Sequence, residues 1–354
     1  MKPLPKLLRP FRYLGILLLT LCVGASVYTC VSVPKVSKEN KAVIKEVMRS
    51  PLPEIVKGST GFVESQGWKV WYEDIRPESL ANGTSKGTVV LVMGAANDAL
   101  SWPLDFISKF TDAGYRVIRY DHRGTGLTTS KEGWDRKNPY TLADMAQDPL
   151  AILDTLNIQK AHFVGVSMGG MISQRVAIDY PERILSLTSI MSSGNVMDGE
   201  LPSTDLEILP EMISAIVKQG ILGGKKGKIK LQLVHKKILM GEATGDIAAK
   251  PVAEAALYNL KKRDGYNFMA GRQHQKGIEI SSSRYEDLKK LTLPVLVVHG
   301  EQDPVIPIAH GKKMVSLVPN ADSLWLTNMG HNLPDTLLDT IAERAIGNFE
   351  RKLD

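Results

Sequence analysis

Mostly apolar runs of six to eight residues recur along the chain, at residues 88–93, 115–120, 161–166, 184–191 and 293–300. Runs without a regular polar face are typical of parallel strands that are covered on both sides. Between these runs, apolar residues recur at the spacing of helices. This alternation of strands and helices predicts an α/β fold with a doubly wound, mostly parallel sheet.

The pattern changes at both ends of this region. Residues 61–76 alternate apolar and polar side chains around Trp68 and Trp71, which predicts an opening antiparallel hairpin. Residues 321–326 are a last predicted strand, and the stretch up to Phe349 is expected to close the domain as an amphipathic helix.

Helical spacing predicts two helices between the early strands, at residues 101–113 and 140–156. The second has a start signal, because Thr141 can cap the helix while Asp144, three residues on, returns the hydrogen bond. Its position before the run at 161–166 fits the alternation of strands and helices.

Residues 200–285 interrupt this alternation. Helical spacing recurs there at residues 207–219, 229–240 and 252–260, around a segment at residues 220–227 that is rich in glycine and lysine. We expect that segment to be flexible. The sequence therefore predicts a helical insertion after the sixth strand.

The strongest chemical signal is the motif Gly-Val-Ser-Met-Gly at residues 165–169, between a predicted strand and a predicted helix. Strand, G-x-S-x-G and helix together are typical of the nucleophile elbow. A side chain in place of Gly165 or Gly169 would collide with a neighbouring strand or helix, and the turn raises the Ser167 hydroxyl above the sheet. A glycine-rich turn with an incidental serine is the alternative interpretation.

A loop at residues 94–98 follows the predicted strand at 88–93. Such a loop can turn a backbone N–H toward the nucleophile, and the first N–H groups of a helix are free to do the same. We therefore assign the N–H groups of Ala95 and Met168 as the oxyanion hole. An ordinary connecting loop is the alternative.

Two further residues are candidates for the partners of Ser167. Asp303 lies just past the predicted strand at 293–300, where catalytic residues of α/β proteins gather, and its carboxylate can orient an imidazole. Among seven histidines, His331 lies in a turn after the last predicted strand. Asp121 and Arg123 are interpreted as parts of a structural polar turn.

These motifs resemble the α/β-hydrolase superfamily, and the chain is similar to the aclacinomycin methylesterase-like hydrolases. The resemblance covers roughly residues 60–350, and its main motifs lie at residues 121–126, 138–146, 164–172 and 185–193. It implies an α/β-hydrolase fold with a helical cap at about residues 195–285. The order Ser167, Asp303, His331 matches the nucleophile, acid and base order of the family. One departure is Met93, where many members have a histidine before the glycine.

We therefore expect hydrolysis of a small-molecule carboxylic ester through an acyl-enzyme. Ser167 attacks, His331 moves the proton and Asp303 orients His331, so no metal or organic cofactor is required. The same triad serves carbon–carbon bond, lactone and amide hydrolases and acyltransferases, which stay open as alternatives. A non-catalytic, membrane-tethered binding protein is a further alternative that the complete triad argues against.

The first 33 residues differ from the rest of the chain. Residues 1–12 carry four basic residues and no acidic one, and residues 14–33 are almost wholly apolar or small. This pattern predicts a membrane anchor first, a cleaved signal peptide second and a lipoprotein signal at Cys30 third. The basic flank predicts export of the remainder, so the protein is expected to be membrane-anchored or secreted, at a bacterial inner membrane and facing the periplasm.

The predicted domains are therefore a signal or anchor at residues 1–33, a linker at 34–58 and the hydrolase domain at 59–354. The linker is interpreted as a polar tether with a short helix at residues 39–48. Both cysteines lie before residue 34, which excludes a cysteine nucleophile from the hydrolase domain. The net charge of +6 is spread without a basic stripe, which argues against nucleic-acid binding.

Overall fold

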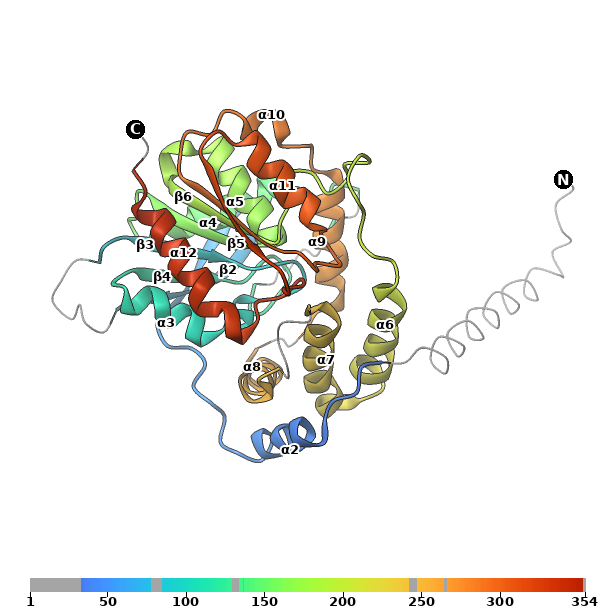
Figure 1. The fold of residues 1–354 in the computed structure, drawn as a ribbon. Coiled ribbons are helices and arrows are strands. Elements are labelled where there is room, and N and C mark those ends of the chain that lie inside the picture. The colour runs from blue at the N-terminus through green and yellow to red at the C-terminus, as the bar shows by residue number, and fades with distance from the viewer. Residues whose placement is uncertain are drawn as a thin grey trace, which may run out of the picture.

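The structure, a computed structural model, describes residues 33–77, 85–128, 134–135, 137–241, 247–263 and 266–352. The described residues form one eight-stranded sheet with the order β1-β2-β4-β3-β5-β6-β7-β8 (Figure 1). The strands are β1 (Ser59–Ser65), β2 (Trp68–Ile75), β3 (Thr88–Val92), β4 (Arg116–Tyr120), β5 (Ala161–Val166), β6 (Ile184–Ile190), β7 (Val295–Gly300) and β8 (Ala321–Leu326).

Pairing in the sheet is mostly parallel, as predicted. The hairpin β1–β2 is antiparallel, β2 also pairs antiparallel with β4, and all neighbours from β4 to β8 are parallel. Every residue of β3, β5 and β7 is buried. The predicted α/β fold with a doubly wound, mostly parallel sheet is confirmed, because the apolar runs are indeed covered on both faces.

Helices cover the two faces of the sheet in separate layers. Alternate residues of a strand point to opposite faces, and in β3 Leu91 belongs to the core cluster with α3 and α12, while Val90 belongs to the cluster with α4, α5 and α11. Phe110 of α3 and Phe349 of α12 lie in tilted contact, with ring centroids 5.8 Å apart. These layer helices are α3 (Leu104–Asp112), α4 (Leu142–Thr155), α5 (Met168–Asp179), α11 (Ile308–Leu317) and α12 (Leu338–Glu350).

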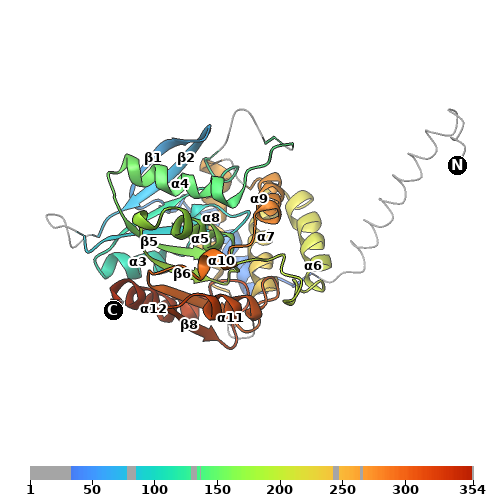
Figure 2. The same cartoon turned by 90° about the horizontal axis from the view of Figure 1, so that it is seen from above.

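Further helices lie between β6 and β7. Those from α6 to α9 stand together beside the sheet, whereas α10 lies against α5 and α11 (Figures 1 and 2). The segment that we expected to be flexible is partly helical, since α7 already begins at Gly224. A Cβ at Gly227 would lie 2.3 Å from the carbonyl oxygen of Gln219, so this glycine allows a tight turn into α7. The helices are α6 (Ile208–Ala215), the π-helical turn η5 (Ile216–Ile221), α7 (Gly224–Leu239), α8 (Ala249–Lys262), α9 (Phe268–Ile280) and α10 (Tyr285–Leu288).

The short helix predicted at residues 39–48 is confirmed, but the interpretation of residues 34–58 as a polar tether is wrong. They contain α2 (Lys38–Val47), whose Ile44 and Val47 are buried in one cluster with Leu233 of α7 and Leu257 of α8. The two apolar residues lie three positions apart on one helical face, and the insertion covers that face. The many lysines of this segment make the short apolar stripe of α2 hard to recognise from the sequence.

The end of the same segment is fixed to the sheet. The carbonyl oxygen of Ile55 accepts a hydrogen bond of 2.9 Å from the Arg119 guanidinium. The N–H groups of Lys57 and Gly58 donate to the Glu73 carboxylate, at 2.5 and 2.7 Å. The chain is therefore held along its path from α2 to β1.

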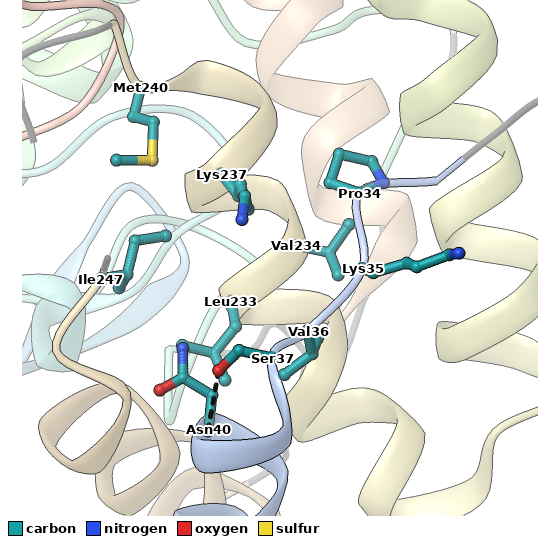
Figure 3. Close-up of a pocket in the computed structure, with 10 residues that line it drawn as sticks. All are labelled: Pro34, Lys35, Val36, Ser37, Asn40, Leu233, Val234, Lys237, Met240 and Ile247. Carbon is teal, nitrogen blue, oxygen red and sulfur yellow. Dashed lines mark hydrogen bonds between the residues drawn. The ribbon is translucent and has the colours of Figure 1, made fainter. Parts of the chain in front are cut away.

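A pocket lies where the N-terminal segment meets α7 (Figure 3). Pro34, Val36 and Asn40 line one side, and Leu233 and Met240 line the other. Neither Ser167 nor His331 lines this pocket, so it is separate from the predicted nucleophile.

The segment predicted as a signal or anchor lies outside the described residues, which begin at Val33. Among the helices that the structure does describe, none combines the length and the hydropathy that a membrane span requires. Asn82 and Gly83, a dipeptide that predicts a turn, also lie outside the described residues.

Candidate active site

Ser167 lies in the sharp turn between β5 and α5. Its backbone is in a strained region, with φ of 55° and ψ of −121°. Two neighbouring groups hold this turn: the Ser167 N–H donates to the carbonyl oxygen of Ile190 at 2.9 Å, and the Ser192 hydroxyl donates to the Ser167 carbonyl oxygen at 2.7 Å. Strain that is maintained by surrounding hydrogen bonds is typical of functional sites.

The glycines on both sides of Ser167 are required by close packing. A Cβ at Gly165 would lie 2.3 Å from the carbonyl oxygen of Gly169, and a Cβ at Gly169 would lie 1.9 Å from that of Val92. Real Cβ atoms do not approach this closely, so the collisions that the motif predicted are present in the structure.

The structure brings Ser167, His331 and Asp303 together from distant parts of the chain. His331 follows β8 and Asp303 follows β7. The His331 Nε2 lies 3.0 Å from the Ser167 Oγ, and its Nδ1 lies 2.7 Å from the Asp303 Oδ2. These contacts are consistent with a neutral imidazole that donates from Nδ1 to the carboxylate and accepts from the hydroxyl at Nε2.

Several groups fix the Asp303 carboxylate. Its Oδ1 accepts hydrogen bonds from the N–H groups of Val305 and Ile306, at 2.9 and 2.8 Å. Burial alone would raise the pKa of Asp303, but the adjacent His331 and His299 imidazoles outweigh it and hold the pKa well below its ordinary value. Asp303 is therefore ionised at neutral pH.

His299 lies inside the apolar run at residues 293–300, a place that favours a structural role, and it is buried inside β7. Its Nε2–H donates to the carbonyl oxygen of Ile306 at 2.7 Å, and Nε2 also lies 3.4 Å from the Asp303 Oδ2. His299 thus supports the turn that carries Asp303, a role that a histidine in a buried strand does not reveal by its position alone.

The two residues assigned to the oxyanion hole lie on either side of Ser167. Met168 is the first residue of α5, so its N–H has no partner within the helix. A Cβ at Gly94 would lie 3.4 Å from the Ser167 Cβ, which places the loop with Ala95 beside the nucleophile. The Asn97 side-chain amide donates to the Ala95 carbonyl oxygen at 3.0 Å and orients that loop.

The polar turn after β4 has a structural part, as expected. The Asp121 carboxylate accepts hydrogen bonds from the N–H groups of Ala99 and Leu127 and pairs with Arg263, the residue that follows α8. Burial raises the pKa of Asp121 to about 6, against the opposing effect of Arg263. His122 donates from Nε2 to the carbonyl oxygen of Met93 at 2.7 Å, so it supports the end of the strand before residues 94–98. We call these residues the oxyanion loop, after their predicted role.

One residue at this site was missed by the sequence analysis. His274 of α9 contacts the backbone N–H of Ala96, next to Ala95. The sequence pattern predicts no helix at residues 268–280, and no motif marks this histidine among the seven. The small residues Gly271 and Gly277, three positions to either side, were the available signal for a helix that approaches other backbone closely.

Comparisons with known proteins support the fold and the enzyme class. The family model described as alpha/beta hydrolase fold matches residues 87–217. Rhodomycin D methylesterase DnrP from Streptomyces peucetius is 29% identical over 275 residues, which cover 72% of this chain and 88% of the relative. A 2-hydroxy-6-oxononadienedioate/2-hydroxy-6-oxononatrienedioate hydrolase from Pseudomonas sp is 25% identical over 285 residues, covering 77% and 90%.

A solved structure shows the same fold. The esterase RhEst1 from Rhodococcus sp. ECU1013 matches with a TM-score of 0.61 at 21% identity, covering 82% of this chain and 99% of that one. The matched family model, the named hydrolases among the relatives and the observed sheet lead to one conclusion. The chain is an α/β-hydrolase-fold enzyme of the hydrolase class, and named esterases are among its relatives.

Proposed function

We propose that this enzyme is a serine hydrolase that cleaves a carboxylic ester through an acyl-enzyme. The observation that carries the proposal is the continuous path of hydrogen bonds from Ser167 through His331 to Asp303. A strained serine beside a neutral imidazole, which is itself oriented by an ionised carboxylate, is the arrangement that activates a hydroxyl for attack on a carbonyl carbon.

In the proposed reaction the His331 Nε2 takes the proton from the Ser167 hydroxyl as its Oγ attacks the ester carbonyl. The N–H groups of Ala95 and Met168 stabilise the resulting oxyanion. His331 then gives the proton to the leaving alcohol, and the acyl group stays on Ser167. A water molecule, deprotonated by His331, attacks the acyl-enzyme and releases the acid.

For the substrate class, we infer a methyl ester as the first candidate. Two relatives are named rhodomycin D methylesterases, DauP and DnrP, at 27% and 29% identity. A second candidate is hydrolysis of a carbon–carbon bond, which the relative from Pseudomonas supports through its name. The two reactions use the same nucleophile and base, so only the substrate separates them.

The test uses the full chain, because α2 packs on the insertion and a protein that began at residue 59 would lack it. Methyl and nitrophenyl esters of increasing acyl length are compared with a 2-hydroxy-6-oxo-dienoate substrate. We expect ester turnover, which Ser167→Ala should reduce by about 10⁶-fold. Ser316→Ala, at an exposed serine of α11, is the matched control and should leave turnover unchanged.

Labelling with a fluorophosphonate probe checks the nucleophile independently of the substrate. We expect labelling of the wild type and of Ser316→Ala, and none of Ser167→Ala. A folded wild-type protein that is not labelled would contradict the serine mechanism. Turnover of the dienoate substrate with no ester turnover would replace the ester proposal by carbon–carbon hydrolysis.

We further infer export of the hydrolase domain, from the basic residues 1–12 and the apolar stretch at 14–33. Protease treatment of intact spheroplasts tests this proposal. We expect digestion of the hydrolase domain, and full protection would contradict export.

A further inference from the structure

Helix α9 approaches the loops around Ser167 unusually closely. A Cβ at Gly271 would lie 3.1 Å from the Ala96 Cβ, and a Cβ at Gly277 would lie 3.0 Å from the carbonyl oxygen of Tyr140. Glycine at these two positions removes the side chains that would otherwise hold the helix away. The face of α9 that carries both glycines therefore rests on the oxyanion loop and on the start of α4.

His274 lies between these two glycines and is completely buried. Both ring nitrogens are used: the Ala96 N–H donates to Nδ1 at 3.0 Å, and Nε2 lies 2.8 Å from the carbonyl oxygen of Arg123. A carbonyl oxygen only accepts, so Nε2 carries the proton and Nδ1 is the acceptor. Burial lowers the pKa of His274 to about 4, which keeps this neutral form at neutral pH.

The partner of His274 in the oxyanion loop needs support. Ala96 has a φ of 64°, a left-handed conformation that is unfavourable for alanine. The peptide between Ala95 and Ala96 is held at both polar atoms, since its oxygen accepts from the Asn97 side chain and its N–H donates to His274. This peptide sets the direction of the chain immediately after the Ala95 N–H.

The second partner of His274, the carbonyl oxygen of Arg123, belongs to a turn that is held in place by an ion pair. The Arg123 guanidinium forms a buried ion pair with Asp148 of α4, at 2.7 Å. The Arg123 carbonyl oxygen is thus part of a fixed turn, and His274 spans the space between that turn and the oxyanion loop.

We propose that His274 is a positioning residue that holds the Ala95–Ala96 peptide, so that the insertion helix α9 shapes the oxyanion hole. The inference rests on the proposed serine-hydrolase function. Chemically, His274 acts through the loop and does not touch the reacting atoms. Through this contact the insertion contributes to the stabilisation of the transition state.

Three substitutions separate the two hydrogen bonds. His274→Leu removes both. His274→Asn places an amide oxygen near the position of Nδ1, where it can accept from Ala96, whereas His274→Gln places its amide near Nε2 and favours the bond to Arg123. His162→Leu is the matched control. His162 is also a buried histidine, but it lies near the start of β5, and its Nδ1 contacts the Ser186 hydroxyl of β6.

Each protein is measured per active site, titrated with the fluorophosphonate probe. We expect His274→Leu to lower kcat by about 10²-fold with little change in KM, since displacement of a catalytic group by about 1 Å costs this much. Affinity for a trifluoromethyl ketone, whose adduct with a serine carries an oxyanion, should fall in parallel. His274→Asn should recover more of the lost kcat than His274→Gln, and His162→Leu should keep the wild-type kcat.

The alternatives give different results. Wild-type kcat in His274→Leu, a change in KM alone, or equal recovery by asparagine and glutamine would each overturn the proposal. If His274→Leu does not fold, the comparison of His274→Asn with His274→Gln decides. A wild-type protein that the probe does not label would instead reject the serine-hydrolase function itself, and this outcome is seen before any variant is compared.

Discussion

The backbone N–H of His331 donates a hydrogen bond of 2.6 Å to the carbonyl oxygen of Leu239, the last residue of α7. The loop that carries the proposed base is therefore held by the end of an insertion helix. His274 makes a comparable connection from α9 to the oxyanion loop. Two helices of the insertion thus contact the site through hydrogen bonds to its backbone, in addition to any contact with substrate.

Gly330→Ala tests the connection between α7 and His331. A Cβ at residue 330 would lie 2.2 Å from the Leu239 carbonyl oxygen and 2.6 Å from the Gly241 nitrogen, so the loop and the helix end must separate. We expect kcat to fall by about 10²-fold through displacement of His331. Steady-state kinetics measure this, with Gly347→Ala on α12 as the control, since nothing lies near its added Cβ. A wild-type kcat in Gly330→Ala would contradict the prediction, because the loop that carries His331 would then accommodate the added Cβ without displacing the base.

Asp303→Asn tests the role of the carboxylate. We expect kcat to fall by about 10⁴-fold, because the amide no longer holds His331 in the required tautomer. The variant should also be less stable than the wild type above about pH 4, where an unfolded aspartate is ionised. The pKa of Asp303 in the folded protein is depressed. The stability advantage of the wild type is therefore lost as the pH falls from about 4 through the folded pKa.

Urea unfolding at pH 7 and at acidic pH measures the stability difference between wild type and Asp303→Asn. A difference that stays constant with pH would contradict an ionised Asp303 in the folded protein. Activity near the wild-type value would show that another residue supplies the acid.

Arg263→Leu tests the buried ion pair between the end of α8 and the turn after β4. Arg263 and Asp121 are both almost fully buried, so removal of the cation should cost about 3–5 kcal/mol at pH 8. The folded pKa of Asp121, already raised by burial to about 6, should rise further without Arg263. The cost should therefore shrink as the pH falls below that raised value, because a protonated Asp121 no longer needs a cation.

Unfolding by urea at several pH values checks this prediction. The double variant Arg263→Leu with Asp121→Asn is the control, and it should lose less stability at pH 8 than Arg263→Leu alone. Equal losses would mean that the charge of Asp121 does not matter.

Ile44→Ala tests the packing of α2. Its side chain is completely buried against α7 and α8, so truncation should destabilise these helices by about 2–5 kcal/mol. Hydrogen exchange should then increase in α2, α7 and α8 but not in β5. Glu46→Ala, at an exposed position on the same helix, should leave exchange unchanged. Faster exchange throughout the sheet would indicate that the insertion does not behave as a separate unit.

Much of the fold could be predicted because its signals are local. The apolar runs of β3, β5 and β7 are long enough to identify buried strands, and the elbow at Ser167 has its own glycines beside it. Thr141 and Asp144 form the expected capping box at the start of α4. In each case, residues that are close in sequence determine the structure.

The features that were missed depend on contacts between distant residues. The helix that carries His274 approaches the site closely because Gly271 and Gly277 meet loops that lie far away in the sequence. Likewise, Ile44 is buried only because α7 and α8 cover it. Local sequence patterns carry no information about which surface will cover such residues.

The packing of α2 also has a consequence for the evolution of this enzyme. Residues that precede the first strand share a hydrophobic core with the insertion, and the insertion in turn holds the loop of His331. The segment of chain that must be inherited together to preserve the site therefore includes α2 as well as the sheet and the insertion. Recombination that exchanged the N-terminal segment between relatives would have to exchange the facing surfaces of α7 and α8 with it.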